Sequence, residues 1–312
     1  MPLECDLSEW LEISVSVDGE AAEAVSQVFN RYGVGGAVLE LRVLDAPDDT
    51  YYSVAPKGSV KTYIPVEDED TRQKIERALW LLGRLYPLPE PQFKVLAARD
   101  WAEAWRQNFG LQRVGCSFVI KPPWEAYTPA PGERIIELEP GMAFGTGLHP
   151  STRLCLMALE DYLSPGDSAL DLGTGSGILA IAAARLGANS VLALDIDPVA
   201  VNEARSNIER NGVSQQVRLY VGSLIPPANA KPGFYVPQGQ RFDCVVVNIL
   251  AEIIASLAPR LTGSLKPTGR IIASGIIEER LDIVLDAFAK FGLAIREEKR
   301  EQDWVALIAT LR

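Results

Sequence analysis

One stretch constrains the fold of this chain more than any other: Ser168-Ala-Leu-Asp-Leu-Gly-Thr-Gly-Ser-Gly-Ile-Leu-Ala-Ile-Ala183. An apolar run ends in an acid, three alternate glycines follow, and an apolar helical pattern closes the stretch. This pattern predicts a buried strand, a tight turn and a helix. Because glycines carry no side chains over the turn, a ligand can approach the backbone where the helix presents its free N–H groups. We therefore expect a nucleotide-like ligand there, held by Gly173 and Gly175.

The glycine spacing separates two kinds of nucleotide site. A dinucleotide fingerprint requires G-x-G-x-x-G, and counted from Gly173 its third glycine would fall on Ile178. The spacing therefore favours a ligand without phosphates over a nicotinamide dinucleotide. The next apolar run ends in Asp195, whose carboxylate can accept both hydroxyls of a ribose.

Composition sets the outer limits. A chain of 312 residues, 47% hydrophobic and 23% charged, is typical of a globular protein of two domains. No apolar run is long enough to span a bilayer and the first residues lack a signal-peptide pattern, so we expect a cytoplasmic protein without a membrane contact. The four cysteines are scattered without metal-ligand spacing, which indicates neither a disulfide framework nor a metal site.

Charge is uneven along the chain. Residues 1–97 carry 17 acidic and 9 basic side chains, whereas residues 98–312 carry 24 and 21. Direct nucleic-acid binding needs clustered Lys and Arg, so this balance argues against it and is compatible with a basic protein partner. The alternative is that the acids serve only solubility.

The N-terminal third predicts one small domain. Its apolar periodicity indicates, in order, strand 10–17, helix 20–32, strand 36–43, strand 60–66, helix 71–86 and strand 93–98. This βαββαβ order is the ferredoxin-like pattern, so we expect an α+β ferredoxin-like domain over residues 1–98. Such a fold serves many purposes and gives little information about function.

A linker over residues 99–116 follows. Trp101, Trp105 and Phe109 recur at fourfold spacing on a short helix. The aromatic stripe is typical of a helix packed between two domains, and a surface that stacks substrate is the alternative.

Residues 117–312 alternate between strands and helices, which predicts a doubly wound, Rossmann-like α/β domain. Asp197 before Pro198 is explained as a helix N-cap. The proline-rich segment 223–241 reads as a surface insertion, and Gly222-Ser223 at its start is expected near an adenine. Before the first core strand, the glycine-rich loop 141–149 leads into a helix at which Ser151 or Thr152 offers a hydroxyl. That loop could fold over a ligand, or it could be a loop and cap without one.

Asn248 follows the strand 242–247, at the carboxyl edge where open α/β sheets bind ligands. Its amide oxygen could accept a hydrogen bond from a substrate amine. Asn after a buried strand is also a common turn former. An enzyme acting on a nucleic-acid amine would need an aromatic side chain after the Asn to stack the base, and Ile249-Leu250-Ala251 supply none. A module that only binds a ligand would not need Asn248.

Four motifs in this order carry a closer resemblance: Phe144-Gly-Thr-Gly-Leu-His-Pro-Ser-Thr152, Asp171-Leu-Gly-Thr-Gly-Ser-Gly-Ile-Leu-Ala180, Asp195-Ile-Asp-Pro198 and Asn248-Ile-Leu-Ala251. Asp171-x-Gly-x-Gly-x-Gly with a second acid resembles class I S-adenosylmethionine methyltransferases, and the full set resembles the PrmA-type methyltransferases of ribosomal proteins. Only the set, and no single motif, is specific.

The resemblance implies transfer of methyl groups from S-adenosyl-L-methionine to a large-subunit ribosomal protein, number eleven. The target amines would be lysine side chains, with the N-terminal amine as a further candidate. Family cofactor contacts fall on positions matching Thr152, Gly173, Asp195 and Asn248, and the N-terminal domain would recognise the substrate. The acidic segment 45–70 and the insertion 223–241 depart from the pattern. We expect a monomer.

Methyl transfer to an amine requires a neutral nucleophile. A lysine amine has a reference pKa near 10.4, so the site must desolvate it and orient its lone pair. Asn248 and nearby carbonyl groups are our candidate acceptors and Asn248 our catalytic residue. His149, the sole histidine, could act as a base, but a histidine before proline is more often structural.

Overall fold

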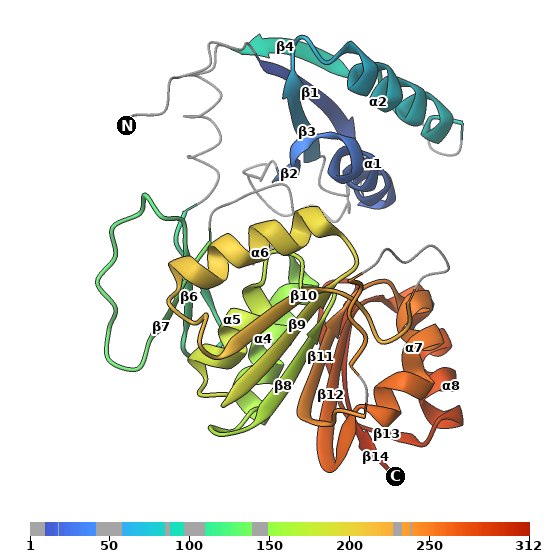
Figure 1. The fold of residues 1–312 in the computed structure, drawn as a ribbon. Helices are drawn as coiled ribbons and strands as arrows, with labels where there is room; N and C mark the ends of the chain where they lie inside the picture. The colour runs from blue at the N-terminus through green and yellow to red at the C-terminus, as the bar shows by residue number, and fades with distance from the viewer. Residues whose placement is uncertain are drawn as a thin grey trace, which may run out of the picture. The chain divides into compact units, whose positions relative to one another are not determined.

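The computed structural model describes residues 10–17, 19–41, 58–84, 88–96, 110–138, 149–226, 233–237 and 239–312. It divides the chain into two compact units, Met1–Phe109 and Gly110–Arg312. The aromatic helix expected at 100–109, the glycine-rich loop up to residue 148 and parts of the two departing segments lie outside the described residues. Figure 1 shows the elements of each unit.

The first unit has a four-stranded antiparallel sheet and two helices. Its elements are β1 (Trp10–Val17), α1 (Gly19–Tyr32), β2 (Val34–Leu41), β3 (Gly58–Pro65), α2 (Glu69–Leu82) and β4 (Gln92–Leu96), and the strand order is β2-β3-β1-β4. Ile13, Val25, Phe29 and Ile75 are fully buried, so the helices cover one face of the sheet. Asp68 caps α2 by accepting the Thr71 N–H at 3.1 Å.

The second unit begins with a small three-stranded sheet. Its strands are β5 (Gln112–Val114), β6 (Phe118–Lys121) and β7 (Arg134–Glu137). The predicted linker 99–116 thus includes a strand, which pairs with β6 in an antiparallel register. Three residues are too few for a periodicity to appear in the sequence.

A seven-stranded mixed sheet forms the centre of the second unit, in the order β10-β9-β8-β11-β12-β14-β13. The strands are β8 (Ser168–Leu172), β9 (Ser190–Asp195), β10 (Val217–Val221), β11 (Phe242–Asn248), β12 (Leu265–Ile277), β13 (Leu293–Glu301) and β14 (Trp304–Leu311), and the helices are α4 (Pro150–Tyr162), α5 (Ile178–Arg185), α6 (Pro198–Arg210), α7 (Ala251–Gly263) and α8 (Leu281–Lys290), with the short 3-10 helix η1 (Glu278–Arg280). All neighbouring strands are parallel except those paired with β14. The expected α/β class is confirmed.

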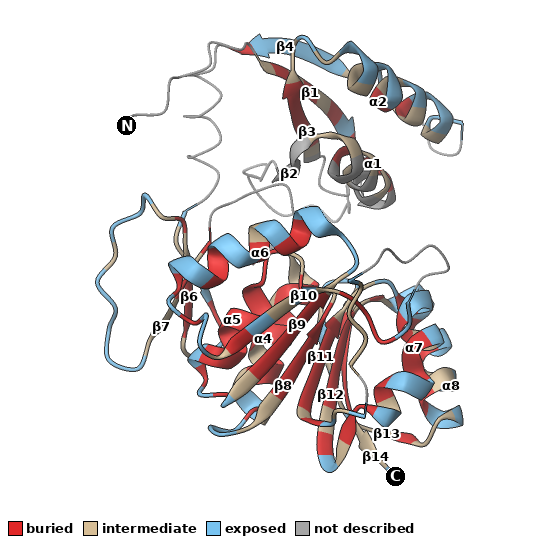
Figure 2. Ribbon diagram, viewed as in Figure 1, coloured by how far each residue is buried: buried red, intermediate tan, exposed pale blue. Residues whose placement is uncertain are grey.

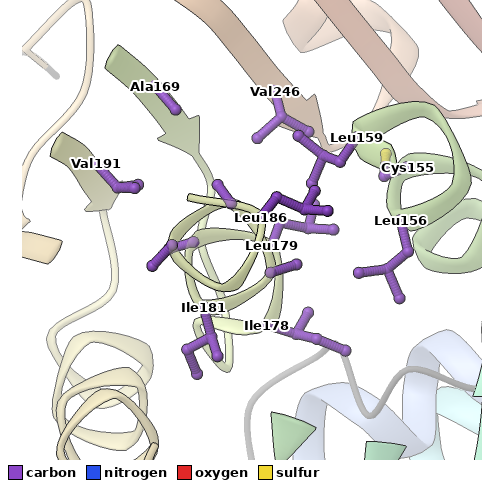
Figure 3. Packing of buried hydrophobic residues seen from close by; sticks show 14 of the residues in the cluster. Cys155, Leu156, Leu159, Ala169, Ile178, Leu179, Ile181, Leu186, Val191 and Val246 are labelled. Atoms are coloured by element: carbon purple, nitrogen blue, oxygen red, sulfur yellow. The ribbon is translucent and has the colours of Figure 1, made fainter. Parts of the chain in front are cut away.

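The central strands of the sheet are buried on both faces, as the red strands in Figure 2 show. Ala169 packs with α4 and α5, whereas its neighbour Leu170 packs on the opposite face with α7 and α8. Figure 3 shows the first of these clusters, with labelled side chains from α4 (Cys155, Leu156, Leu159), α5 (Ile178, Leu179, Ile181), the turn after α5 (Leu186) and the strands (Ala169, Val191, Val246). Two covered faces leave the strand ends as the open part of the sheet.

Strand β13 ends in a charged run that an apolar pattern does not predict as strand. Residues 296–301 are all charged, so they lack the apolar alternation that predicts a strand. They form one because Glu297 to Glu301 pair with β14 at the sheet edge, where water solvates their side chains.

Candidate functional site

The candidate site lies at the carboxyl ends of three neighbouring strands, β9, β8 and β11. Each strand end carries a residue or loop that the sequence predicts to be functional: Asp195 ends β9, Asn248 ends β11, and the glycine loop follows β8. Parallel pairing brings these ends to one edge of the sheet, because the registers align Leu172 with both Leu194 and Val247. A ligand at this edge would meet all three groups.

The glycine loop has the strand, turn and helix that the pattern predicts. Gly173, Gly175 and Gly177 have φ of 76°, 53° and 86°, a region that side chains disfavour. A Cβ on Gly173 would lie 2.4 Å from the Ile249 Cγ2 atom. The loop is fixed to the next strand, since the N–H groups of Gly173 and Thr174 donate to the Leu194 carbonyl at 2.8 and 3.0 Å. Glycine is therefore required for conformation and for close packing.

Asp195 is held by two backbone N–H groups. Gly175 N donates to its Oδ2 atom at 2.9 Å, and Asp197 N donates to Oδ1 at 3.0 Å. The residue is half-exposed, so its carboxylate keeps lone pairs for further donors. Asp197 caps α6 by accepting the Val199 N–H at 2.8 Å, with Pro198 at the first helical position, as the sequence predicts. Of the two acids, Asp195 is the one whose carboxylate oxygens can still accept hydrogen bonds from hydroxyl groups.

Asn248 and Thr152 come together from distant parts of the chain. The Asn248 Nδ2 atom donates to the Thr152 hydroxyl at 3.2 Å, and Thr152 is fully buried in the first turn of α4. The Asn248 Oδ1 atom is buried and has no hydrogen-bond partner among the described residues. A buried carbonyl oxygen without a donor costs free energy, so a ligand that brings a hydrogen-bond donor to this atom would satisfy it.

Asp171 is a further buried acid, which the sequence analysis quoted in its motif but did not place in the site. Its Oδ2 atom accepts from the Thr174 hydroxyl at 2.6 Å and from the Ala180 N–H at 3.0 Å. Its Oδ1 atom has no hydrogen-bond partner in the described part of the chain. Burial raises the pKa of this carboxyl to about 7, while the two hydrogen bonds act in the opposite direction. Through these two bonds Asp171 fixes the glycine loop to the start of α5.

His149 caps α4. Its Nδ1 atom accepts the Ser151 N–H at 3.3 Å and lies 2.7 Å from the Ser151 hydroxyl. The ring meets Trp304 edge to face, with centroids 4.4 Å apart. Burial lowers the pKa of the imidazole to about 4, so the ring is neutral at pH 7. These contacts support the structural interpretation of His149 over the base.

The insertion after β10 folds back on the strand it leaves. Tyr235 N donates to the Val221 carbonyl at 2.9 Å, and Ser223 N donates to the Tyr235 carbonyl at 3.1 Å. The Tyr235 ring stacks on Tyr220 with centroids 4.5 Å apart. Gly222 is predicted to lie near an adenine. Its N–H donates to the Asp195 carbonyl at 2.8 Å, which fixes it to β9.

An apolar side chain beside Asp195 escaped the sequence analysis. Ile196 is 65% exposed, next to the acid at the strand end. Its signal in the sequence was weak, because a single Ile between two acids shows no periodicity. Such a side chain can cover one face of a flat aromatic ligand.

The site fits S-adenosylmethionine. A carboxylate with free lone pairs can accept ribose hydroxyls, and a glycine loop without side chains lets a ligand approach the backbone. The Oδ1 atoms of Asp171 and Asn248 have no donor among the described residues. Among the described residues no group of three or more His, Cys, Asp or Glu side chains could hold a metal ion. Nor does the described part of the chain contain a helix with the length and apolar character of a membrane span.

Known proteins resemble this chain along almost its whole length. A family model described as "Ribosomal protein L11 methyltransferase (PrmA)" matches residues 9–312. The chain is 45% identical to the ribosomal protein L11 methyltransferase of Chloroflexus aurantiacus over 96% of this chain and 98% of that protein. It is 40% identical to the same-named protein of Pelotomaculum thermopropionicum over 97% and 99%. A solved ribosomal protein L11 methylase from Lactobacillus delbrueckii subsp. bulgaricus matches with a TM-score of 0.58 at 35% identity, covering 65% of this chain and all of that one.

Proposed function

The chain belongs to the ribosomal protein L11 methyltransferase (PrmA) family and is a protein methyltransferase, and we propose that it transfers methyl groups from S-adenosylmethionine to amino groups of ribosomal protein L11. Lysine side chains are the proposed targets, with the N-terminal amine as a second kind. The observation that carries the proposal is the Asn248 Oδ1 atom, a buried acceptor without a partner in the described residues, on the strand that neighbours β8 and its glycine loop.

Besides Thr152 and Asn248, four groups are proposed to hold the methyl donor. Gly173 and Gly175 line the turn, and Asp195 accepts the two ribose hydroxyls while its inner side is held by Gly175 N and Asp197 N. Ile196 covers a face of the adenine. When bound, S-adenosylmethionine supplies an electrophilic methyl group on a positively charged sulfur.

Asn248 is the proposed catalytic residue. Its amide nitrogen is occupied by Thr152, which fixes the orientation of the amide and leaves its oxygen without a partner among the described residues. In this proposal that oxygen accepts a hydrogen from the substrate amine and orients the nitrogen lone pair. Thr152 thus acts through Asn248. The resemblance to the family also assigns this position a contact with the methyl donor. Because positive charge passes to the nitrogen, acceptors are what the reaction requires.

The amine loses its proton without help from His149 in this proposal. A neutral imidazole whose Nδ1 accepts the Ser151 N–H has its acceptor atom occupied. Moving a lysine ammonium into a partly buried site lowers its pKa, which raises the fraction of neutral nucleophile. Water can then take the proton before the amine enters.

The first unit is proposed to be the substrate-recognition domain. Its βαββαβ order and strand order β2-β3-β1-β4 support a ferredoxin-like fold. The acidic balance of residues 1–97 suits a basic ribosomal protein. We further propose that the enzyme works as a monomer in the cytoplasm and makes no contact with nucleic acid or membrane.

Mass spectrometry tests the function directly. The full chain is incubated with S-adenosylmethionine and purified ribosomal protein L11, and mass increments of one methyl group are mapped to residues. Increments on lysine or on the N-terminal amine are expected, and the Asn248→Ala variant should lose them. A wild-type reaction that leaves the ribosomal protein unmodified would contradict the proposal.

A further inference from the structure

Two exposed apolar side chains stand beside the proposed acceptor. Leu250 is 59% exposed and Ile253 is 44% exposed, although their neighbours Ala251 and Ile254 are buried in the core. The Ile253 N–H donates to the Leu250 carbonyl at 3.0 Å, so the pair shares the first turn of α7. Leu250 follows Asn248 by two residues. Single exposed apolar residues are ordinary, but two such residues at the same helix start, directly after a proposed site residue, indicate a contact surface.

The backbone between the acceptor and this pair is rigidly placed. Gly275 adopts φ of 80° and packs against Ile249, where an added Cβ would lie 2.4 Å from the Ile249 carbonyl oxygen. Ile249 N also donates to the Ser274 carbonyl at 3.2 Å. The position of Leu250 relative to Asn248 is therefore fixed by β12, and the exposed pair is preformed.

Acidic groups border the pair on the side of η1. Glu252 in the same turn forms an ion pair with Arg280 at 3.4 Å, and Glu278 forms one with Arg300 at 2.6 Å. Glu279 and Asp303 are exposed beside them, and the Glu278 N–H donates to the Asp303 carbonyl at 2.9 Å. Glu298 also pairs with Arg300, at 3.2 Å, so five carboxylates and two guanidinium groups lie along this rim. The rim is negative, which favours a basic partner.

We infer that Leu250 and Ile253 form a docking surface for the segment of the ribosomal protein that carries the target amine, with the η1 carboxylates holding its basic side chains. This inference rests on the proposed function and adds a second recognition surface, within the methyltransferase unit. Apolar residues flanking the target lysine would pack on the pair, while the amine reaches Asn248. The surface selects the segment, whereas Asn248 acts on the amine.

Direct binding and turnover test the inference in the full chain. The double variant Leu250→Ser/Ile253→Ser should weaken binding of purified ribosomal protein L11 by about tenfold, since buried apolar anchors dominate interfaces. Calorimetry should give unchanged affinity for S-adenosylmethionine. The conservative variant Leu250→Met/Ile253→Val should restore binding. Ile283→Ser, which changes a 37% exposed apolar side chain on α8, serves as the matched control and should bind like the wild type.

The outcomes separate this inference from the proposed function. Unchanged affinity of the serine variant for the ribosomal protein would overturn the docking surface, and so would an equal loss in the Ile283→Ser control. Because binding is measured without turnover, a wild-type chain that binds the ribosomal protein but transfers no methyl group would refute the function alone. A thermal midpoint within a few degrees of the wild type shows that the variants fold.

Discussion

The side-chain amide of Asn248 donates to the hydroxyl of Thr152 at 3.2 Å, although 96 positions separate the two residues in the chain. This bond joins the end of β11 to the first turn of α4, and it decides which end of the amide is left to accept a further hydrogen bond. The same amide turned over would present a donor, which cannot accept a hydrogen from an amine. The orientation of the acceptor therefore depends on a residue that does not need to touch the amine.

Thr152→Val tests this dependence. Valine keeps the shape of threonine and removes the hydroxyl, which leaves the Asn248 N–H without its buried acceptor at a cost of about 1–3 kcal/mol. We expect turnover to fall by about tenfold or more, and Thr152→Ser to retain most of it. Steady-state kinetics with saturating S-adenosylmethionine measure this. Equal activity of the Val and Ser variants would contradict the positioning role.

Asn248→Ala should affect turnover more than binding of the methyl donor. Removing the acceptor leaves the amine unoriented, and misplacement by about 1 Å can cost roughly a hundredfold in rate. Turnover is read from methylated ribosomal protein and donor affinity from calorimetry. Should affinity collapse while turnover survives, Asn248 belongs to donor binding.

Asp195→Ala should weaken donor binding by about 1.5–3 kcal/mol, the range for hydrogen bonds to a charged group. Asp197→Ala is the matched control, because it removes a neighbouring carboxylate that only caps α6. The control should lose about 0.5–2 kcal/mol of stability and keep its affinity. Calorimetry and urea unfolding read the two effects separately, and similar affinity losses in both variants would remove the ribose assignment.

The sequence predicted the parts of the site that arise from local pattern. The strand, turn and helix around Gly173 and the capping role of Asp197 follow from spacing and from backbone chemistry within a few residues. The Thr152–Asn248 contact could not be predicted this way, because it depends on how α4 packs against the sheet. The exposure of Leu250 was hidden for the same reason, since its neighbours Ala251 and Ile254 are equally apolar and yet buried.

The pKa of Asp171 predicts a pH-dependent stability. Burial raises it to about 7 in the folded protein from 3.8, so the native state binds the proton more tightly than the unfolded chain. Stability should therefore fall as pH rises from about 4 to 7, by at most about 1.4 kcal/mol per pH unit. Asp171→Asn keeps the acceptor for Thr174 and removes the titration.

Urea unfolding of wild type and Asp171→Asn at pH 5, 6 and 7.5 measures this contribution as the difference between the two proteins. His149, with its pKa lowered to about 4, acts in the opposite direction below its ordinary value of 6.5, but it is present in both proteins and cancels. The stability of the Asn variant relative to the wild type should rise across the series. A difference that does not change with pH would show that Asp171 is ionised throughout.

The division of labour between the two units gives the last prediction. A fragment should begin at Gly110, because a later start would remove β5 and with it the strand that pairs with β6. Every group proposed to hold the methyl donor lies within residues 110–312, so the fragment should bind S-adenosylmethionine like the full chain. It should methylate ribosomal protein L11 at least about tenfold less efficiently, since it lacks the acidic first unit.

Raising salt from about 50 to 300 mM should slow association of the full chain with the ribosomal protein and leave the affinity for S-adenosylmethionine unchanged, because screening weakens long-range attraction. A fragment that methylates as fast as the full chain, with the same response to salt, would assign recognition to the second unit alone.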